Sequence, residues 1–191
     1  HHAEAAASFG RAAAAKPNSS LADMNSAKLH IHRQELTEAE TCLRRAVARD
    51  PKVSEAWRLL AMILSQLGRF DEAIKCLEKA IALQPGHVAA YYDLVNAKKL
   101  TQSDLPLVAQ MRTLAASPSL TDLEHVSLHF ALGKALDDLG EHGQAITHFD
   151  EANRSASSRY SFDHAGHRAS IDRTIACYDF DTLSSQATES R

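Results

Sequence analysis

A spacing of 34 residues constrains this chain more than any other feature of its sequence. Pro17, Pro51 and Pro85 are separated by 34 and 34 residues. Three further sets of residues keep the same spacing: Ala5, Ala39 and Ala73; Ala12, Ala46 and Ala80; and Phe9, Leu43 and Leu77. Four columns in register predict a chain built from one supersecondary unit whose copies stack on their neighbours.

The most regular unit, residues 54–87, predicts two helices joined by a tight turn. Its first apolar stripe has the spacing i, i+3, i+4, i+7 and comprises Trp57, Leu60, Ala61 and Leu64. Gly68 permits the turn, and Pro85 prevents the second helix from continuing. The second stripe comprises Ala73, Leu77 and Ala80. With its small residues where two helices must approach closely, this unit closely resembles a tetratricopeptide repeat (TPR).

The composition agrees with a helical protein of one domain. The 191 residues include only 7 Gly and 5 Pro, which favours helix and disfavours a β-sandwich or barrel. A net charge of −3 gives no electrostatic reason to expect nucleic acid as a partner. The longest apolar run, residues 59–64, is far shorter than the ~20 residues of a membrane span, so we expect no membrane partner. The three cysteines show no C-x-x-C spacing, and we therefore expect a reducing, cytoplasmic location.

The resemblance implies an all-α fold, a right-handed α-solenoid of about three and a half TPR helix-turn-helix repeats plus a C-terminal helix. We expect a truncated repeat that keeps its second helix (1–19), two full repeats (20–53 and 54–87), an atypical repeat with an insertion (88–125), a further repeat (126–157), and a loop with a capping or connector helix (158–191). The truncation leaves an apolar surface open at the N-terminal end, through which the chain could self-associate. His1 and His2 fit either a tag remnant or a polar turn.

TPR arrays generally bind peptides or proteins along a concave groove that is lined by the first helix of each repeat. The resemblance implies such a groove in this chain. The resemblance places Met24 and Glu55 on that face, together with the residues expected to bind a peptide: Lys28, Arg58, Met62, Tyr92, Asn96, Lys99, Phe130 and Lys134. Four bases against one acid predict a mildly basic groove, which would favour an acidic peptide through salt-sensitive attraction. The alternative is a solvated face with an ordinary scatter of Lys and Arg. Asp93 and Ala131 depart from the clamp that one TPR subclass uses for terminal carboxylates.

The second half carries a more specific resemblance. Its segments AKKLT, SPSLTD, HFALGKALDDLG and DEANR look like the region that precedes the catalytic domain in bacterial TPR-sulfotransferase proteins. The resemblance covers about residues 90–183 and implies an interaction module whose catalytic domain, with 3′-phosphoadenosine 5′-phosphosulfate as its cofactor, lies outside this chain. Within the chain we expect no cofactor and no catalytic residue. The alternative is a stand-alone TPR adaptor that self-associates or docks a partner helix.

Histidine and cysteine spacing raise two further hypotheses. His125 and His129 are four residues apart, a spacing that suits a metal on one helix face, but no cysteine or clustered carboxylate completes a ligand set. Packing therefore explains His129, and we expect no metal site. Cys42 and Cys76 occupy one column of neighbouring repeats, where helix axes lie ~8–10 Å apart, too far for a disulfide. We expect both to be buried and unpaired.

Overall fold

The computed structural model describes residues 19–157 and 164–177, and all regular secondary structure in them is helical. The chain divides into two units, with the boundary after Ala156. The first unit contains the repeats, and the second contains α10 (His164–Cys177), which lies within the segment 158–191 where a loop and a capping or connector helix are expected. Residues 1–18, and with them the expected truncated repeat, lie outside the described residues. None of the described helices combines the length and hydropathy needed to cross a membrane.

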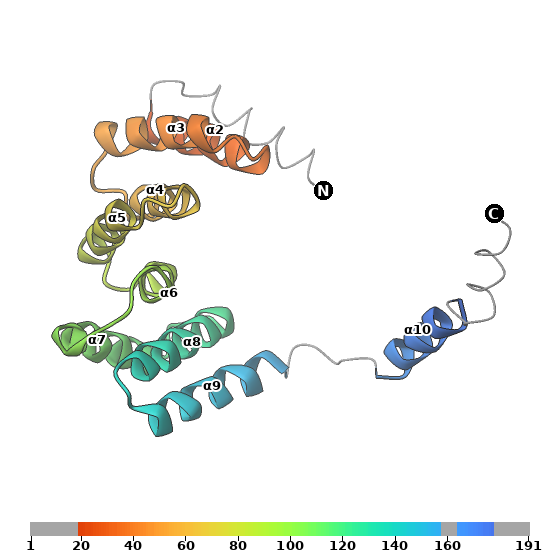
Figure 1. Cartoon of the computed structure of the whole chain (residues 1–191). Coiled ribbons are helices and arrows are strands. Elements are labelled where there is room, and N and C mark those ends of the chain that lie inside the picture. Colours follow the sequence, from red (N-terminus) through yellow and green to blue (C-terminus); the bar gives the residue numbers. More distant parts are fainter. Residues whose placement is uncertain (1–18, 158–163, 178–191) are drawn as a thin grey trace, which may run out of the picture. The chain divides into compact units, whose positions relative to one another are not determined.

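Helix pairs follow one another through the first unit (Figure 1). The elements are α2 (Ser20–His32), α3 (Leu36–Arg49), α4 (Ser54–Gln66), α5 (Phe70–Leu83), α6 (Val88–Ala97), the 3₁₀ turn η1 (Gln102–Asp104), α7 (Leu105–Ala115), α8 (Asp122–Asp138) and α9 (His142–Ser157). Each helix from α2 to α5 packs on the next along the chain, and α6 also packs on α8. Within this unit, α4, α6 and α8 lie on the inner side of a curve and α5 and α7 on its outer side. The expected all-α repeat solenoid is confirmed.

The repeat register extends to individual hydrogen bonds. Ser20 Oγ donates to the carbonyl of Ala46 at 3.1 Å, and one period later Ser54 Oγ donates to the carbonyl of Ala80 at 2.9 Å. In both cases a serine at the start of a first helix binds the last turn of a second helix. The same hydrogen bond therefore joins the two helices in both repeats, and the 34-residue spacing keeps its donor and its acceptor in place.

Positive backbone angles mark the turn inside a repeat. Gly68 and Gly140 have φ of 76° and 81°, in the left-handed region that glycine adopts without steric cost. Gln34, one period before Gly68, has φ of 61°. The turn geometry is therefore a property of the repeat, and α2–α3 achieves it with a residue that is strained there.

The atypical repeat departs from the register after Ala97. Its first helix, α6, ends there, because Lys98 is extended (φ −140°, ψ 152°). The chain then turns Leu100 into the core, where it is 1% exposed. The amide of Leu100 donates to Asp138 Oδ2 of α8 at 3.0 Å. The insertion is thus held by a residue of the following repeat.

The first helix of the following repeat begins ahead of residue 126, where the repeat is expected to start, and its packing depends on one glycine. Helix α8 starts at Asp122, because Thr121 and Glu124 form a capping box. Further along α8, a methyl group added at Gly133 would lie 2.6 Å from Cε1 of Phe149 in α9. Gly133 therefore lets the aromatic ring lie directly against the α8 backbone.

A buried carboxylate replaces apolar packing in the first described repeat. Asp23 of α2 occupies the column of Trp57, and its side chain is 8% exposed. Two arginines of α3 reach it: Arg45 Nε lies 3.1 Å from Oδ1, and Arg49 Nε lies 2.8 Å from Oδ2. Both arginines are about half exposed, so two cations near the surface compensate one buried carboxylate and tie α2 to α3.

The two cysteines described with their side chains behave as expected from their column. Cys42 and Cys76 are both buried and free of disulfides. Burial raises the pKa of each thiol, so neither is activated as a nucleophile. Both are packing residues.

Candidate functional site

A hollow of about 220 Å³ opens where α4, α5 and α6 meet. It combines an apolar part with hydrogen-bonding side chains, and it is lined by Met62, Ser65, Gln66, Phe70, Leu77, Asp93, Asn96 and Ala97. Phe70, the first residue of α5, is 51% exposed and offers part of its ring to the hollow that it lines. Two of the residues expected to bind a peptide, Met62 and Asn96, come together here.

Arg58 lies one helical turn before Met62 on α4 and joins this site through Asp93. Its Nε and Nη2 donate to the two carboxylate oxygens of Glu55 at 2.8 and 2.9 Å, and its Nη1 donates to Asp93 Oδ2 at 3.0 Å. The Arg58 side chain is only 18% exposed. Hydrogen bonds to Glu55, and then to Asp93, raise the pKa of Arg58 above its ordinary range. The cation predicted to face a ligand is therefore already engaged by two carboxylates.

His87, in the turn before α6, extends this network. Its Nε2 lies 3.2 Å from Glu55 Oε2. Burial alone would raise the pKa of Glu55, but the hydrogen bonds from His87 and Arg58 outweigh it and lower the pKa from 4.5 to about 2. Glu55 therefore stays ionised and keeps Arg58 in place.

Ser54, His87 and Glu55 resemble a nucleophilic arrangement, but their environment makes them part of the scaffold. His87 Nδ1 lies 2.6 Å from Ser54 Oγ. However, Ser54 is 5% exposed and its hydroxyl donates to the carbonyl of Ala80, which is the bond that Ser20 repeats one period earlier. A nucleophile needs access to its substrate and a base that accepts its proton, and Ser54 has neither.

The other predicted residues of α2 and α6 are spread along the inner face. Tyr92 is 42% exposed, and the Asn96 side-chain amide donates to the Tyr92 carbonyl at 2.8 Å. Lys99 is exposed just beyond the end of α6, and Lys28 is half-buried on α2. Met24 is buried in the core, so it offers no surface to a ligand.

On α8, the two predicted residues have partners within their own repeat. The rings of Phe130 and Phe149 lie 6.4 Å apart, so Phe130 packs against α9. Lys134 Nζ lies 2.6 Å from Asp138 Oδ2. The prediction of a mildly basic groove included Arg58 and Lys134 among its positive charges. Asp93 lies beside Arg58 and Asp138 lies beside Lys134, so neither cation adds an unpaired positive charge to the groove.

Asp93 is the main site residue that the sequence pattern did not identify. It lies 35 positions after Arg58, one period plus one residue. Residues with that separation lie on neighbouring first helices, and opposite charges there were the signal that could have revealed the pair. Phe70 carried a second signal, an aromatic residue directly after the turn at Gly68.

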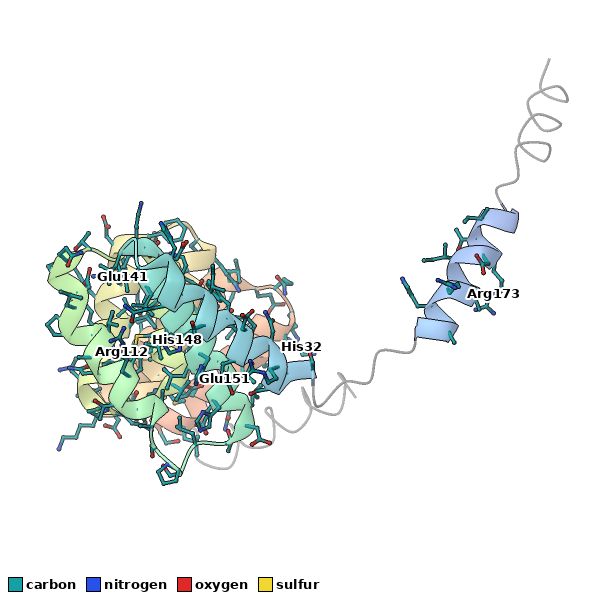
Figure 2. The ribbon with its side chains drawn as sticks, turned by 90° about the horizontal axis from the view of Figure 1, so that it is seen from below. His32, Arg112, Glu141, His148, Glu151 and Arg173 are labelled. Atoms are coloured by element: carbon teal, nitrogen blue, oxygen red, sulfur yellow. The ribbon has the colours of Figure 1, made fainter. Side chains whose placement is uncertain are left out.

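The histidine pair of α8 has a neighbour on α9. Nδ1 of His129 lies 3.3 Å from Nδ1 of His148, and the His125 ring centroid lies 6.0 Å from that of His129. Figure 2 shows His148 on the same side of the molecule as Arg112 and Glu151. In the part of the chain that the structure describes, no group of three or more His, Cys, Asp or Glu side chains is arranged to hold a metal ion.

Comparison with known proteins identifies the repeat. Models of one family, each described as a tetratricopeptide repeat, match residues 1–63, 54–87 and 126–158, together more than half of the chain. An uncharacterized protein of Aquifex aeolicus (strain VF5) is 24% identical over 151 residues, which are 79% of this chain and 19% of that protein. The chain therefore spans about a fifth of the length of the curated relative it matches.

Solved structures share the architecture. The crystal structure of MamA matches with a TM-score of 0.59 and 19% identity, over 81% of this chain and 88% of that one. YrrB, described as a TPR protein with an unusual peptide-binding site, matches with a TM-score of 0.56 and 15% identity, over 85% of this chain and 79% of that one. At these identities the likeness shows the fold. With its 34-residue register and its stacked helix pairs, the chain belongs to the tetratricopeptide repeat family.

Proposed function

We propose that this chain is a protein-interaction scaffold that binds a peptide segment at the hollow between α4, α5 and α6. The observation that carries the proposal is the half-exposed Phe70 beside Met62 and the acceptor groups of Asp93 and Asn96, all lining one hollow on the repeat array. An apolar anchor site with a few polar groups at its edge is the usual composition of a binding site. YrrB, which shares the fold and is described as having an unusual peptide-binding site, supports this proposal.

The hollow accommodates one side chain rather than a whole ligand. Its volume of about 220 Å³ is below the range of ~300–1,000 Å³ typical of small-molecule sites. A peptide fits better than a small molecule, because its backbone can continue along the inner face beyond the hollow. Tyr92 and Lys99, both exposed on or beyond α6, would then contact its flanking residues.

The larger protein is a separate part of the proposal. Because the chain spans about a fifth of its curated relative, the scaffold would serve as one module of a longer protein. The resemblance of residues 90–183 to the segment before a bacterial sulfotransferase domain supports a module that presents a substrate to that domain. The coding sequence after Arg191 tests this directly: a strand followed by a P-R-S-G-T-T-type loop is expected, and its absence would overturn the sulfotransferase context but not the scaffold.

Peptide binding by the whole chain tests the scaffold. The probe is a set of fluorescein-labelled Gly-Ser peptides, each with one Leu flanked by Lys, Gln or Glu, and binding is followed by fluorescence anisotropy. We expect Met62→Arg to abolish binding, because the longer charged side chain fills the hollow. Ile146→Arg, at a 60% exposed position on α9, is the matched control and should bind as the unmodified chain does. Binding by no peptide of the set, or equal binding by both variants, would contradict the proposal.

A further inference from the structure

Asp93 is the charged residue among those that line the hollow. Glu55 is held by Nε and Nη2 of Arg58 and lies 3.2 Å from His87 Nε2, whereas Asp93 accepts from Arg58 Nη1. Lys99 lies beyond the end of α6 and is not among the residues that line the hollow. Lys134 is engaged by Asp138 on α8. The charged group that a ligand meets at the hollow is therefore a carboxylate and not one of the cations expected from the sequence.

Asp93 is positioned to bind a cation at the edge of the hollow. Its side chain is 30% exposed and lines the hollow. Its Oδ2 accepts from Arg58, whereas within residues 19–157 no bond is formed to its Oδ1. A carboxylate oxygen at the edge of an apolar hollow accepts a charge-assisted hydrogen bond, which is about twice as strong as one between neutral groups.

The apolar lining of the hollow indicates which kind of side chain a peptide must carry next to the cation that binds Asp93. Met62, Phe70 and Ala97 contribute the apolar wall, and methionine adapts its shape to different side chains. An apolar side chain buried here brings its neighbour in sequence to the edge of the hollow. A Lys or Arg at that neighbouring position can then reach Asp93 while its own methylene groups cover Phe70.

We propose that the hollow selects a peptide that presents an apolar side chain next to a Lys or Arg, with Asp93 receiving the cation. This inference rests on the proposed function and specifies its partner. Arg58 acts as the positioning residue, because it holds the Asp93 carboxylate at the wall through Nη1 and is itself held by Glu55. An acidic peptide is disfavoured because it would face both carboxylates.

The same three peptides, with Leu flanked by Lys, Gln or Glu, test the inference on the whole chain. We expect the order of affinity Lys, then Gln, then Glu, with about fivefold between successive peptides at low salt, the effect of one partly exposed ion pair. Added salt should reduce the differences without reversing them. Asp93→Asn keeps the shape of the side chain and should bring the affinities for the Lys and Gln peptides to within about twofold of each other. Asp150→Asn, at an exposed position of α9, is the matched control and should leave the order unchanged.

Each outcome decides between the two proposals. Binding of the Lys peptide that is lost in Met62→Arg and weakened in Asp93→Asn supports both. Binding that Met62→Arg abolishes, but that is tightest for the Glu peptide, overturns the preference for cations and leaves the scaffold standing. A preference for Lys that survives Asp93→Asn overturns the role of Asp93. Failure of all three peptides to bind overturns the proposed function itself.

Discussion

Arg58 Nη1 and Asp93 Oδ2 lie 3.0 Å apart and join the first helices of two neighbouring repeats. The pair joins α4 to α6 beside the hollow that Asp93 lines. If a partner's cation binds at Asp93 as proposed, its binding and the stacking of the two repeats are coupled through one carboxylate.

Removing the guanidinium of Arg58 should lower the free energy of unfolding more than removing that of an exposed arginine. Arg58→Gln removes the guanidinium that Glu55 and Asp93 share, and we expect a loss of about 1–3 kcal/mol in the free energy of unfolding. Arg154→Gln is the control, because Arg154 is 71% exposed and its ion pair with Glu151 lies at the surface, where such pairs contribute about 0–1 kcal/mol. Urea denaturation followed by circular dichroism measures both variants. Equal losses would show that the Arg58 pairs carry no special weight.

Gly133 should tolerate no side chain while Phe149 stays in place. In Gly133→Ala the new methyl group meets the Phe149 ring at 2.6 Å, so the α8–α9 contact must open, and we expect a loss of about 1–3 kcal/mol. Gly143→Ala is the control in the same repeat, since nothing lies within 4 Å of a methyl group at that helical position and alanine favours helix. Its melting temperature should stay level or rise. Combining Gly133→Ala with Phe149→Leu should recover part of the loss, and no recovery would place the strain elsewhere.

Replacing Gln34 with glycine should stabilise the chain, and Gln34 is not among the residues that line the hollow. Its φ of 61° is close to the angle that Gly68 adopts one period later, so Gln34→Gly should relieve backbone strain. We expect a gain of up to about 1 kcal/mol, reduced by the larger entropy of glycine in the unfolded chain. Gln34→Ala keeps a Cβ and should give no gain. Thermal unfolding compares the two variants, and an equal effect would show that the left-handed angle carries no strain.

His129 of α8 and His148 of α9, which lie side by side, should make the stability of the α8–α9 repeat sensitive to acid. Burial, and then nearby positive charges, lower the pKa of His148 below its usual 6.5, and burial is also the main cause that lowers the pKa of His129. Glu151 opposes the shift at His129, while His125 adds to it, and Arg112 adds to the shift at His148. The folded chain then binds fewer protons than the unfolded chain just below pH 6.5. The stability is complete above that pH and decreases as the pH falls through the window below it.

Two variants isolate this contribution. In His129→Asn combined with His148→Gln, the decrease in melting temperature between about pH 7 and about pH 5 should be smaller than in the unmodified chain. His142→Gln, at an exposed position at the start of α9, is the control and should retain the larger decrease. An unchanged pH dependence in the double variant would contradict the assignment.

The 34-residue register was enough to predict the helix pairs from Ser20 to Leu83, because each column records a packing requirement that recurs in every repeat. It failed after Ala97, where the fold depends on the bond between the Leu100 amide and Asp138. Those two residues are 38 positions apart and share no column, so local spacing carries no sign of their contact. Helix α8 extends to Asp122, ahead of the repeat expected from residue 126, because of a local capping box at Thr121 that lies outside the register.

The site was predicted in part for a similar reason. Helical periodicity placed Arg58, Met62 and Asn96 on the inner face, because that placement depends on backbone geometry alone. The sign of the charge could not be obtained in this way. It depends on which side chains pair across α4 and α6, and Asp93 entered the sequence argument only as a departure from a known clamp. Phe130, expected to line the groove, packs its ring on Phe149, a contact fixed by the α8–α9 angle.

Nuclear magnetic resonance of the isotopically labelled chain, recorded while the peptide with Lys-flanked Leu is added, locates the bound peptide on the repeat array. We expect amide shifts to concentrate at the end of α4, the start of α5 and along α6, with the methyl group of Met62 among the most affected. Shifts that centre on α9, or that stay absent from α4 and α6 while the peptide binds, would contradict binding at the hollow.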